Sequence, residues 1–296
     1  MGLSHELGTL TNEKGEKRAT APYSNLCGID PAPACVVQAA QTSGAATYLG
    51  SLSNIPVEAG VFDMISLSHV LEHVKDLRLA LEKLKPFLKP GASLYIETPD
   101  ARRYADFVFA PFQDFNTEHI NHFSSAGMTN LLHRCGFTLF EAGTKEILSA
   151  PDMPYPALFV FARRISGSPG GMSQDVELKS RLLEYIALSQ QVMDEIETRL
   201  QTVLAQDSEV IVWGTGQLAM KLLAETSLAQ ARIDAFVDGN PLYRGQCLQG
   251  IRIIAPEDVR ASKRPIIVTS ILHHRAIAEK IRQLHLPNPI IALRTI

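Results

Sequence analysis

Little in this chain would place it in a membrane or on a nucleic acid. Its 296 residues contain no uninterrupted run of 18 apolar residues, the length associated with a membrane span. The first stretch, MGLSHELGTLTNEKGEKRAT, is polar and lacks the apolar segment of a secretory signal peptide. The net charge of -3 also lacks the excess of Lys and Arg that nucleic acids and anionic membranes attract. We therefore expect neither kind of partner.

Cysteine is scarce as well. The four cysteines are scattered without C-x-x-C spacing, which disfavours a disulfide framework and a structural zinc site; they are Cys27, Cys35, Cys135 and Cys247. A reducing, cytoplasmic location is the expectation. What the chain does have is an ordinary balance of 46% hydrophobic and 20% charged residues, over a length typical of two domains or of one large domain.

The pattern along the chain predicts an α/β protein in four parts. These are a polar arm (1–25), an α/β domain (26–165), a linker with a long helix (166–207) and a smaller α/β domain (208–296). In the first domain, short apolar runs alternate with helix-length segments, which predicts parallel strands joined by crossover helices. We expect strands at 26–30, 47–49, 62–67 and 93–97, helices at 31–40, 77–84 and 123–135, and an antiparallel closing strand at 158–162.

A break follows this first domain. The stretch 166–171 is rich in Ser, Gly and Pro, which is typical of a linker. Residues 174–206 contain neither Gly nor Pro, and their apolar residues recur mostly at three- and four-residue steps, which predicts one long helix. This helix either packs between the two domains or forms the seam of a homodimer.

The last ninety residues or so return to an α/β pattern. Strands are expected at 209–213, 233–238, 265–269 and 290–293, and helices at 218–226 and 274–284. This part looks like a second, smaller Rossmann-like unit.

The most informative stretch runs from Phe62 to Asp100, FDMISLSHVLEHVKDLRLALEKLKPFLKPGASLYIETPD. A strand that begins F-D-x-I leads into H-V-L-E-H, a helix, L-K-P-G and a strand reading L-x-I-E-x-P. This order resembles the middle of class I S-adenosylmethionine-dependent methyltransferases. The resemblance implies an incomplete Rossmann-like methyltransferase sheet, methyl transfer as the activity, and S-adenosyl-L-methionine as the cofactor.

Asp30 ends the strand before this stretch. A carboxylate at the carboxyl end of a parallel strand faces the ligand crevice and accepts hydrogen bonds from both hydroxyls of a ribose. An Asp in this place is also a common turn former, so both roles stay open. The resemblance implies the ribose role for Asp30, places Gly50, Ser51 and Leu52 near the adenine, and places His69 beside the methionine part of the cofactor.

His69 and His73, with Glu72 between them, also have the spacing of metal ligands on one helix face. A third ligand and the full H-E-x-x-H order are lacking. No metal site is therefore predicted.

One part of the family pattern is missing. The glycine-rich loop should precede the Asp30 strand by about twenty residues, because it lets the backbone approach the cofactor closely. The window from Thr9 to Tyr23 has Gly15 as its only glycine and no apolar strand. We expect either a truncated reading frame or a domain that has lost this contact.

A second constellation, N-T-E-H-I-N-H-F-S, spans Asn116 to Ser124 and precedes the helix that ends at Gly136. Its E-H-x-x-x-F-S core resembles sugar C-methyltransferases. The resemblance implies that His119 is a general base and that Glu118 assists it. A base is needed because a new carbon–carbon bond requires a carbanion or enolate, and imidazole titrates near neutral pH.

Two positions depart from that pattern. The family is expected to carry tyrosines where this chain has Asn116 and His122, which leaves the acceptor and the mechanism open. The alternative is a polar helix N-cap around Ser124 with solvated histidines.

The second domain opens with W-G-T-G-Q-L-A from Trp213 to Ala219, and Asp238 ends the next strand. This is the layout of a dinucleotide-binding fingerprint with Ala at the third small position. The whole block resembles the C-terminal domain of sugar C-methyltransferases, which implies a nucleotide sugar bound near Gly214, Gly216 and Asp238. A purely structural remnant and a nicotinamide-dependent enzyme are the alternatives.

Together these features predict an S-adenosylmethionine-dependent methyltransferase. It would methylate a carbon of a nucleotide sugar or a similar small acceptor, with His119 as the base. The alternative is a truncated, non-catalytic protein that binds a nucleotide sugar or serves in assembly.

Overall fold

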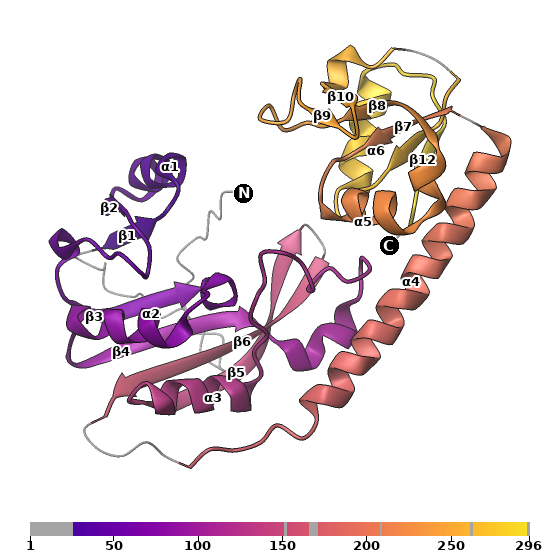
Figure 1. Cartoon of the computed structure of the whole chain (residues 1–296). Helices are drawn as coiled ribbons and strands as arrows, with labels where there is room; N and C mark the ends of the chain where they lie inside the picture. The colour runs from indigo at the N-terminus through magenta and orange to yellow at the C-terminus, as the bar shows by residue number, and fades with distance from the viewer. Residues whose placement is uncertain (1–25, 151–152, 166–170, 208, 261–262, 295–296) are drawn as a thin grey trace, which may run out of the picture.

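The computed structural model describes residues 26–150, 153–165, 171–207, 209–260 and 263–294 (Figure 1). The predicted polar arm, the window of the missing glycine-rich loop and most of the predicted linker lie outside the described residues.

The first α/β region forms two sheets instead of the single sheet that the sequence predicts. A parallel pair, β1–β2, stands apart from a four-stranded sheet with the order β3-β4-β6-β5 (Figure 1). No strand in the described ranges pairs with both β1 and β3, and α1 buries no residue; the segment after β2 contacts the four-stranded sheet through Leu52 and Ile55. The elements, in which η denotes a 3-10 helix, are β1 (Cys27–Asp30), α1 (Pro33–Ser43), β2 (Ala46–Leu49), η1 (Val57–Ala59), β3 (Phe62–Ser68), η2 (Leu71–His73), α2 (Leu77–Leu84), η3 (Lys85–Phe87), β4 (Leu88–Pro99), η4 (Ala101–Phe107), α3 (Ser125–Arg134), β5 (Phe137–Ala150) and β6 (Met153–Arg164).

Pairing within the four-stranded sheet is mixed. β3 and β4 are parallel, and β6 is antiparallel to both β4 and β5, which confirms the predicted closing strand. The strand β5 was not predicted. It is an edge strand whose residues after Phe137 are half-buried or exposed, so it carries little of the apolar signal that reveals a buried strand.

The helices α2 and α3 cover this sheet with apolar faces. Their residues Leu81 and Leu132 are fully buried against Leu94 and Ile96 of β4, in one continuous core. Each helix begins at a capping side chain. Asp76 accepts a hydrogen bond from the N–H of Leu79 at 2.9 Å, and Ser124 accepts one from Gly127 at 3.2 Å.

The long helix α4 (Leu178–Gln206) runs along one side of the molecule from the first α/β region to the second and contacts both (Figure 1). Near its start, Tyr185 is buried against Ala101 and Tyr104 of η4. Further along, Ile196 and Leu200 join the core of the second region. This arrangement agrees with the interdomain alternative, because the buried apolar residues of α4 contact both regions of the chain; Ile186 stays exposed.

The second region is built on a six-stranded sheet with the order β12-β11-β7-β8-β10-β9. Neighbouring strands are parallel except for the short β9–β10 pair. The strands β9 and β10 were not predicted, because two and four residues are too few to show a periodicity. The elements are β7 (Glu209–Trp213), α5 (Gln217–Glu225), η5 (Ser227–Gln230), β8 (Arg232–Val237), β9 (Cys247–Leu248), β10 (Ile251–Ile254), η6 (Pro256–Asp258), β11 (Ile266–Val268), α6 (His274–Gln283) and β12 (Ile290–Ala292).

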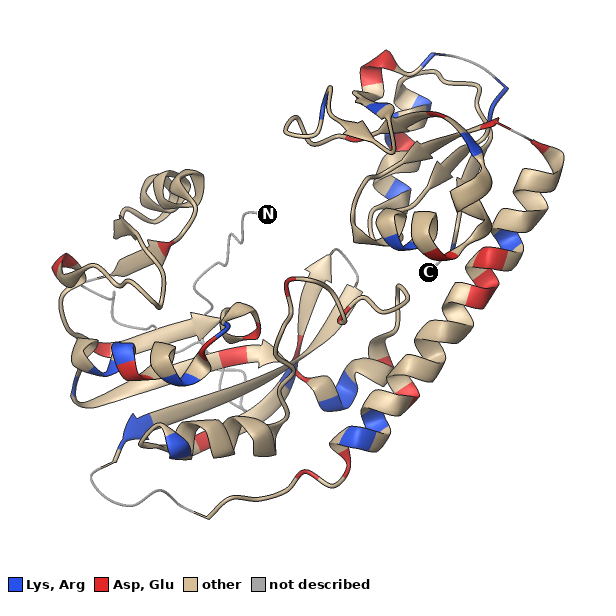
Figure 2. Cartoon of the chain, viewed as in Figure 1, with Lys and Arg blue, Asp and Glu red and all other residues tan. Residues whose placement is uncertain are grey.

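Charge is spread over the molecule. In the view of Figure 2, Lys and Arg alternate with Asp and Glu along most elements and form no continuous basic face. Among the described helices, none combines the length and the apolarity that crossing a membrane requires.

A buried acid joins the first region to α4. Asp114 is 1% exposed, accepts a hydrogen bond from the hydroxyl of Tyr155, and donates its backbone N–H to the hydroxyl of Tyr185 at 2.9 Å. Burial raises the pKa of Asp114 to about 6, although the hydrogen bond from Tyr155 opposes this shift. The folded protein therefore holds this proton more tightly than the unfolded chain does.

We expect the raised pKa of Asp114 to make the protein less stable as the pH rises from about 4 to about 6. The loss from this group amounts to at most about 3 kcal/mol, because the folded state must release a proton that the unfolded state has already lost. Denaturant unfolding at several pH values, compared between the wild type and Asp114→Asn, measures it. Equal pH dependence in both proteins would contradict the assignment.

Candidate functional site

The site is built where β3 and β4 end side by side. The two strands pair with Ser68 opposite Glu97, and the N–H of His69 donates to the carbonyl of Glu97 at 2.9 Å. His69 then has a φ of 52°, in the left-handed region that residues other than glycine rarely adopt. This turn sends the chain out of the sheet and into η2.

A buried carboxylate lies behind the turn. Glu72 is 1% exposed, and its Oε1 lies 3.1 Å from Nδ1 of His69. On the other side, Nε2 of His69 lies 3.4 Å from Oε1 of Glu97. Burial lowers the pKa of His69, but the two carboxylates outweigh burial and raise it to about 9. His69 is therefore an imidazolium between two carboxylates at neutral pH.

Glu97 is held in its charged form. Besides His69, the hydroxyl of Tyr95 and the ammonium of Lys145 contact its carboxylate. Burial alone would raise the pKa of Glu97, but the hydrogen bonds from His69 and Lys145 keep it well below its ordinary value. The carboxyl ends of β3 and β4 thus carry a compensated set of buried charges.

The loop after η4 is bound to η2. The N–H groups of Ile120 and Asn121 both donate to the carbonyl of Glu72, at 2.9 and 3.1 Å. The side chain of Asn121 also donates to two carbonyl groups, within and just after η2. These hydrogen bonds bring His119 next to His73, although the two are far apart in sequence.

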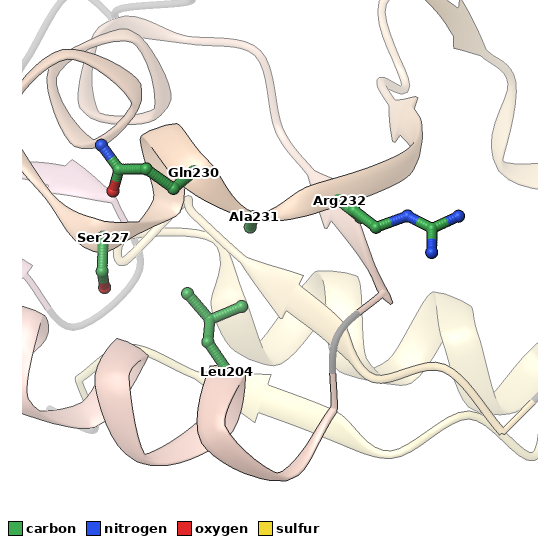
Figure 3. A pocket seen from close by; sticks show the side chains of 5 residues that line it. All are labelled: Leu204, Ser227, Gln230, Ala231 and Arg232. Carbon is green, nitrogen blue, oxygen red and sulfur yellow. The ribbon is translucent and has the colours of Figure 1, made fainter.

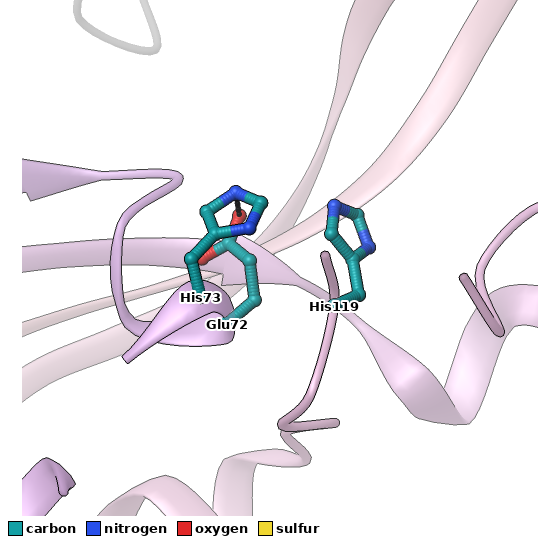
Figure 4. A group of neighbouring side chains, drawn as sticks. All are labelled: Glu72, His73 and His119. Carbon is teal, nitrogen blue, oxygen red and sulfur yellow. Dashed lines mark ion pairs between the residues drawn. The ribbon is translucent and has the colours of Figure 1, made fainter. Parts of the chain in front are cut away.

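Glu72, His73 and His119 form a compact group, here called the Glu72–His73–His119 cluster (Figure 4). The rings of the two histidines are 5.0 Å apart between centroids, and Nε2 of His73 lies 4.0 Å from Oε1 of Glu72. The Nδ1 of His73 lies 2.9 Å from the backbone carbonyl oxygen of Glu118. Since a carbonyl only accepts, Nδ1 of His73 carries the hydrogen.

His119, the predicted base, is half-buried. Its backbone N–H donates to Oδ1 of Asn116 at 2.8 Å, and its ring Nδ1 is buried without a hydrogen-bond partner among the described residues. Burial lowers the pKa of His119, which favours the neutral ring. Glu118, its predicted partner, has an exposed side chain, and the carboxylate that shares the cluster with His119 is that of Glu72.

The structural alternative for this loop made two predictions, an N-cap at Ser124 and solvated histidines, and they have different outcomes. Ser124 caps α3, as the structural alternative proposes. His122 is half-buried instead of solvated: its Nδ1 lies 3.2 Å from the hydroxyl of Tyr104, and its ring contacts Phe115. Burial lowers the pKa of His122 as well. A buried tyrosine, Tyr104, therefore does lie beside residues 116–124, here called the histidine loop, but it belongs to η4 and not to this loop.

The residues predicted to hold the cofactor lie in two places. Asp30 ends β1, and its Oδ1 accepts a hydrogen bond from the N–H of Ala32 at 2.7 Å, the contact expected of a turn former. Ser51 is half-buried, and Leu52 packs against the core of the four-stranded sheet. His69 belongs to the separate group described above. Within the described residues, no hydrogen bond, ion pair or ring contact joins Asp30 to that group.

In the second region, the structure brings Gly214, Gly216 and Asp238 together. Oδ2 of Asp238 accepts hydrogen bonds from the N–H of Thr215 at 3.0 Å and from its hydroxyl at 2.6 Å. Oδ1 accepts one from the N–H of Asn240 at 2.8 Å. Both carboxylate oxygens are therefore occupied in holding the chain's own loop.

A shallow pocket of about 380 Å³ lies where the end of α4 meets η5 and the start of β8 (Figure 3). It is lined by Leu204, Ser227, Gln230, Ala231 and Arg232. It contains none of the residues predicted to bind a ligand.

Comparison with known protein families agrees with this geometry. Residues 9–142 match the family model of a methyltransferase domain, and residues 206–291 match that of the N-terminal domain of C2185-like proteins. The first match begins inside the window in which the sequence shows no glycine-rich loop. This match identifies residues 9–142 as a methyltransferase domain, a type of enzyme domain whose methyl donor is S-adenosylmethionine. No curated protein matches the chain.

Solved structures of similar fold carry related names. An S-adenosylmethionine-dependent methyltransferase from Methanosarcina mazei has a TM-score of 0.37 and 17% identity, over 47% of this chain and 81% of its own. One from Mesorhizobium loti has a TM-score of 0.38 and 19% identity, over 48% and 81%. A possible histamine N-methyltransferase from Thermotoga maritima has a TM-score of 0.37 and 18% identity, over 46% and 71%. Such distant similarity adds nothing to the family match.

Gly214 has a φ of 106°, and a Cβ there would come within 2.7 Å of Oγ1 of Thr269. We expect Gly214→Ala to destabilise the second region by roughly 2–4 kcal/mol, from backbone strain and steric overlap. Gly216→Ala is the matched control, because nothing lies within 4 Å of its Cβ position and its φ is negative; about 1 kcal/mol or less is expected. Similar losses in the two variants, measured by denaturant unfolding, would show that the loop has another conformation.

Proposed function

We propose that this methyltransferase methylates a carbon atom of a small acceptor, of the nucleotide-sugar class, and that His119 removes the proton from that carbon. The observation that carries the proposal is the place of His119. Its half-buried ring has an unpartnered nitrogen, beside a buried carboxylate, at the carboxyl ends of two parallel strands. Ligands of α/β sheets bind at this edge.

The neutral state of His119 suits it to take a proton. Burial lowers its pKa, and a neutral imidazole has a lone pair on one ring nitrogen. The charge of Glu72 acts in the opposite direction and favours the imidazolium once it forms. We therefore propose that Glu72, the buried acid of the cluster, stabilises the protonated base, in the role that the sequence pattern implies for Glu118.

Among the residues predicted to hold the methyl donor, Asp30 fits it in chemical type. Asp30 uses Oδ1 for the turn, and its second oxygen makes no hydrogen bond to the described residues, so it is available to a ribose hydroxyl. His69 already faces the carboxylates of Glu72 and Glu97 with its two ring nitrogens, so it has little donor capacity left for the carboxylate of the methionine part. When bound, S-adenosylmethionine supplies a methyl group on a positively charged sulfur. His119 takes the proton, and the acceptor carbon gains the methyl group as the methyl–sulfur bond breaks.

For the second region we propose a mainly structural role for Asp238. Its two carboxylate oxygens are already engaged by Thr215 and Asn240, which leaves little acceptor capacity for a ribose. This observation favours the structural alternative for this residue over the dinucleotide-binding one.

Asp30→Asn separates the turn role from the ribose role. The Asn side-chain oxygen still accepts from Ala32, but an amide N–H₂ replaces the free oxygen. We expect the affinity for S-adenosylmethionine, measured by calorimetry, to fall by about 10- to 100-fold, the value of a hydrogen bond to a charged group. Asp63→Asn, at an exposed residue paired with Lys89, is the control and should bind normally. Unchanged affinity in Asp30→Asn would remove Asp30 from the cofactor site.

His119→Gln tests the base. With a panel of keto-sugar nucleotides as acceptors, we expect S-adenosylhomocysteine formation to fall by about 10² to 10⁴, the usual contribution of a general base, with S-adenosylmethionine affinity unchanged. His133→Gln on α3, outside the cluster, is the control. If His119→Gln turns over at the wild-type rate, the base assignment is wrong. The position of a ¹³C-methyl label, found by NMR, distinguishes carbon from oxygen methylation.

A further inference from the structure

We propose that Glu72, His73 and His119 bind a divalent transition-metal ion, for which zinc is the probe (Figure 4). Each residue offers one ligand atom, and these atoms all lie within 4.8 Å of one another. From the sequence, a metal was set aside because His69 and His73 lacked a third ligand. The structure supplies a different trio, in which the third ligand comes from the loop after η4.

The donor set suits zinc. Two imidazole nitrogens and one carboxylate oxygen are the protein ligands of a common class of zinc site, in which the fourth position stays open. Ligand atoms bound tetrahedrally at about 2.0–2.2 Å lie about 3.3–3.6 Å apart, so ligand atoms now up to 4.8 Å apart would have to approach one another by about 1.5 Å at most. The side chain of His73 is 41% exposed, which gives an ion a path from solvent.

The surroundings already orient the ligands. Because Nδ1 of His73 donates to the carbonyl of Glu118, the lone pair of the neutral ring is on Nε2, the atom 4.0 Å from Oε1 of Glu72. Oε1 of Glu72 in turn is hydrogen-bonded to Nδ1 of His69. Such hydrogen bonds from outside the ligand set are typical of metal sites, where they fix ring orientation and carboxylate position.

Two buried atoms in the cluster lack partners. The side chain of Glu72 is 1% exposed, and its Oε2 has no hydrogen-bond partner among the described residues. The same is true of Nδ1 of His119. A buried carboxylate oxygen without a donor is unfavourable, since it has lost its water and gained nothing in return. A bound cation would satisfy it.

The ion would compete with the proposed function of the same site. A ring nitrogen that binds a metal has no lone pair left for a proton, so His119 serves either as a ligand or as a base. Zinc binding is therefore expected to suppress methyl transfer, and chelation to restore it. The metal site goes beyond the proposed function and is tested without cofactor or acceptor.

The test is calorimetric titration of the full chain, without a histidine tag and freed of metal by a chelator, with zinc chloride alone. One zinc ion per chain is expected, and His73→Gln should lower the affinity by at least about tenfold. Because His73 is partly exposed, this variant tests the site even if Glu72→Gln fails to fold. Glu118→Gln is the matched control: its carboxylate is exposed and only its backbone carbonyl contacts the cluster, so zinc should bind normally.

No zinc binding by the wild type, or equal affinity in His73→Gln, would overturn the metal site and leave the base role of His119 untouched. Zinc that binds as expected but accelerates methyl transfer would retain the site and overturn the base role. A rise in the unfolding temperature with zinc, absent in His73→Gln, is the second readout.

Discussion

The parallel pairing of β3 with β4 is the constraint on which the site depends. It sets Ser68 opposite Glu97 and ties the N–H of His69 to the Glu97 carbonyl, so both strands end together at one edge. The chain leaves β3 in a left-handed turn at His69, and Glu72 follows in a short buried helix. A shift of one residue in this pairing would turn every side chain to the other face and separate His69 from both carboxylates.

His119 reaches this edge because its loop is held from several sides. On one side, the loop's N–H groups bind the carbonyl of Glu72. On the other, the segment just before it contacts α4 through Asp114, and the guanidinium of Arg294 in the second region donates to the carbonyls of Val108 and Phe109 at 2.9 and 3.0 Å. The long helix and the second region therefore both contact the segment that leads into the loop carrying His119.

The same buried cluster suits two kinds of chemistry for one reason. The buried carboxylate of Glu72 beside the ring of His119 stabilises a positive charge, whether that charge is a proton on His119 or a metal ion shared with His73. Burial lowers the pKa of His119, and Oε2 of Glu72 has no hydrogen-bond donor among the described residues. Both groups can therefore bind a cation. A proton binds one ring nitrogen of His119, whereas a metal ion would bind one atom from each of Glu72, His73 and His119.

Much of the local structure followed from sequence, because strands such as 209–213 and helices such as 77–84 carry their own apolar pattern. The resemblance at Phe62–Asp100 likewise indicated a methyltransferase, which the family match supports. The weakly apolar edge strand β5 and the separation of β1–β2 from the main sheet were missed, since both depend on partners and not on local pattern. Sequence also named His69, His73 and His119, but it considered His73 only together with His69, and His119 only together with Glu118. Only the tertiary structure set His119 beside Glu72 and His73, because hydrogen bonds between segments almost fifty residues apart leave no periodicity in the chain.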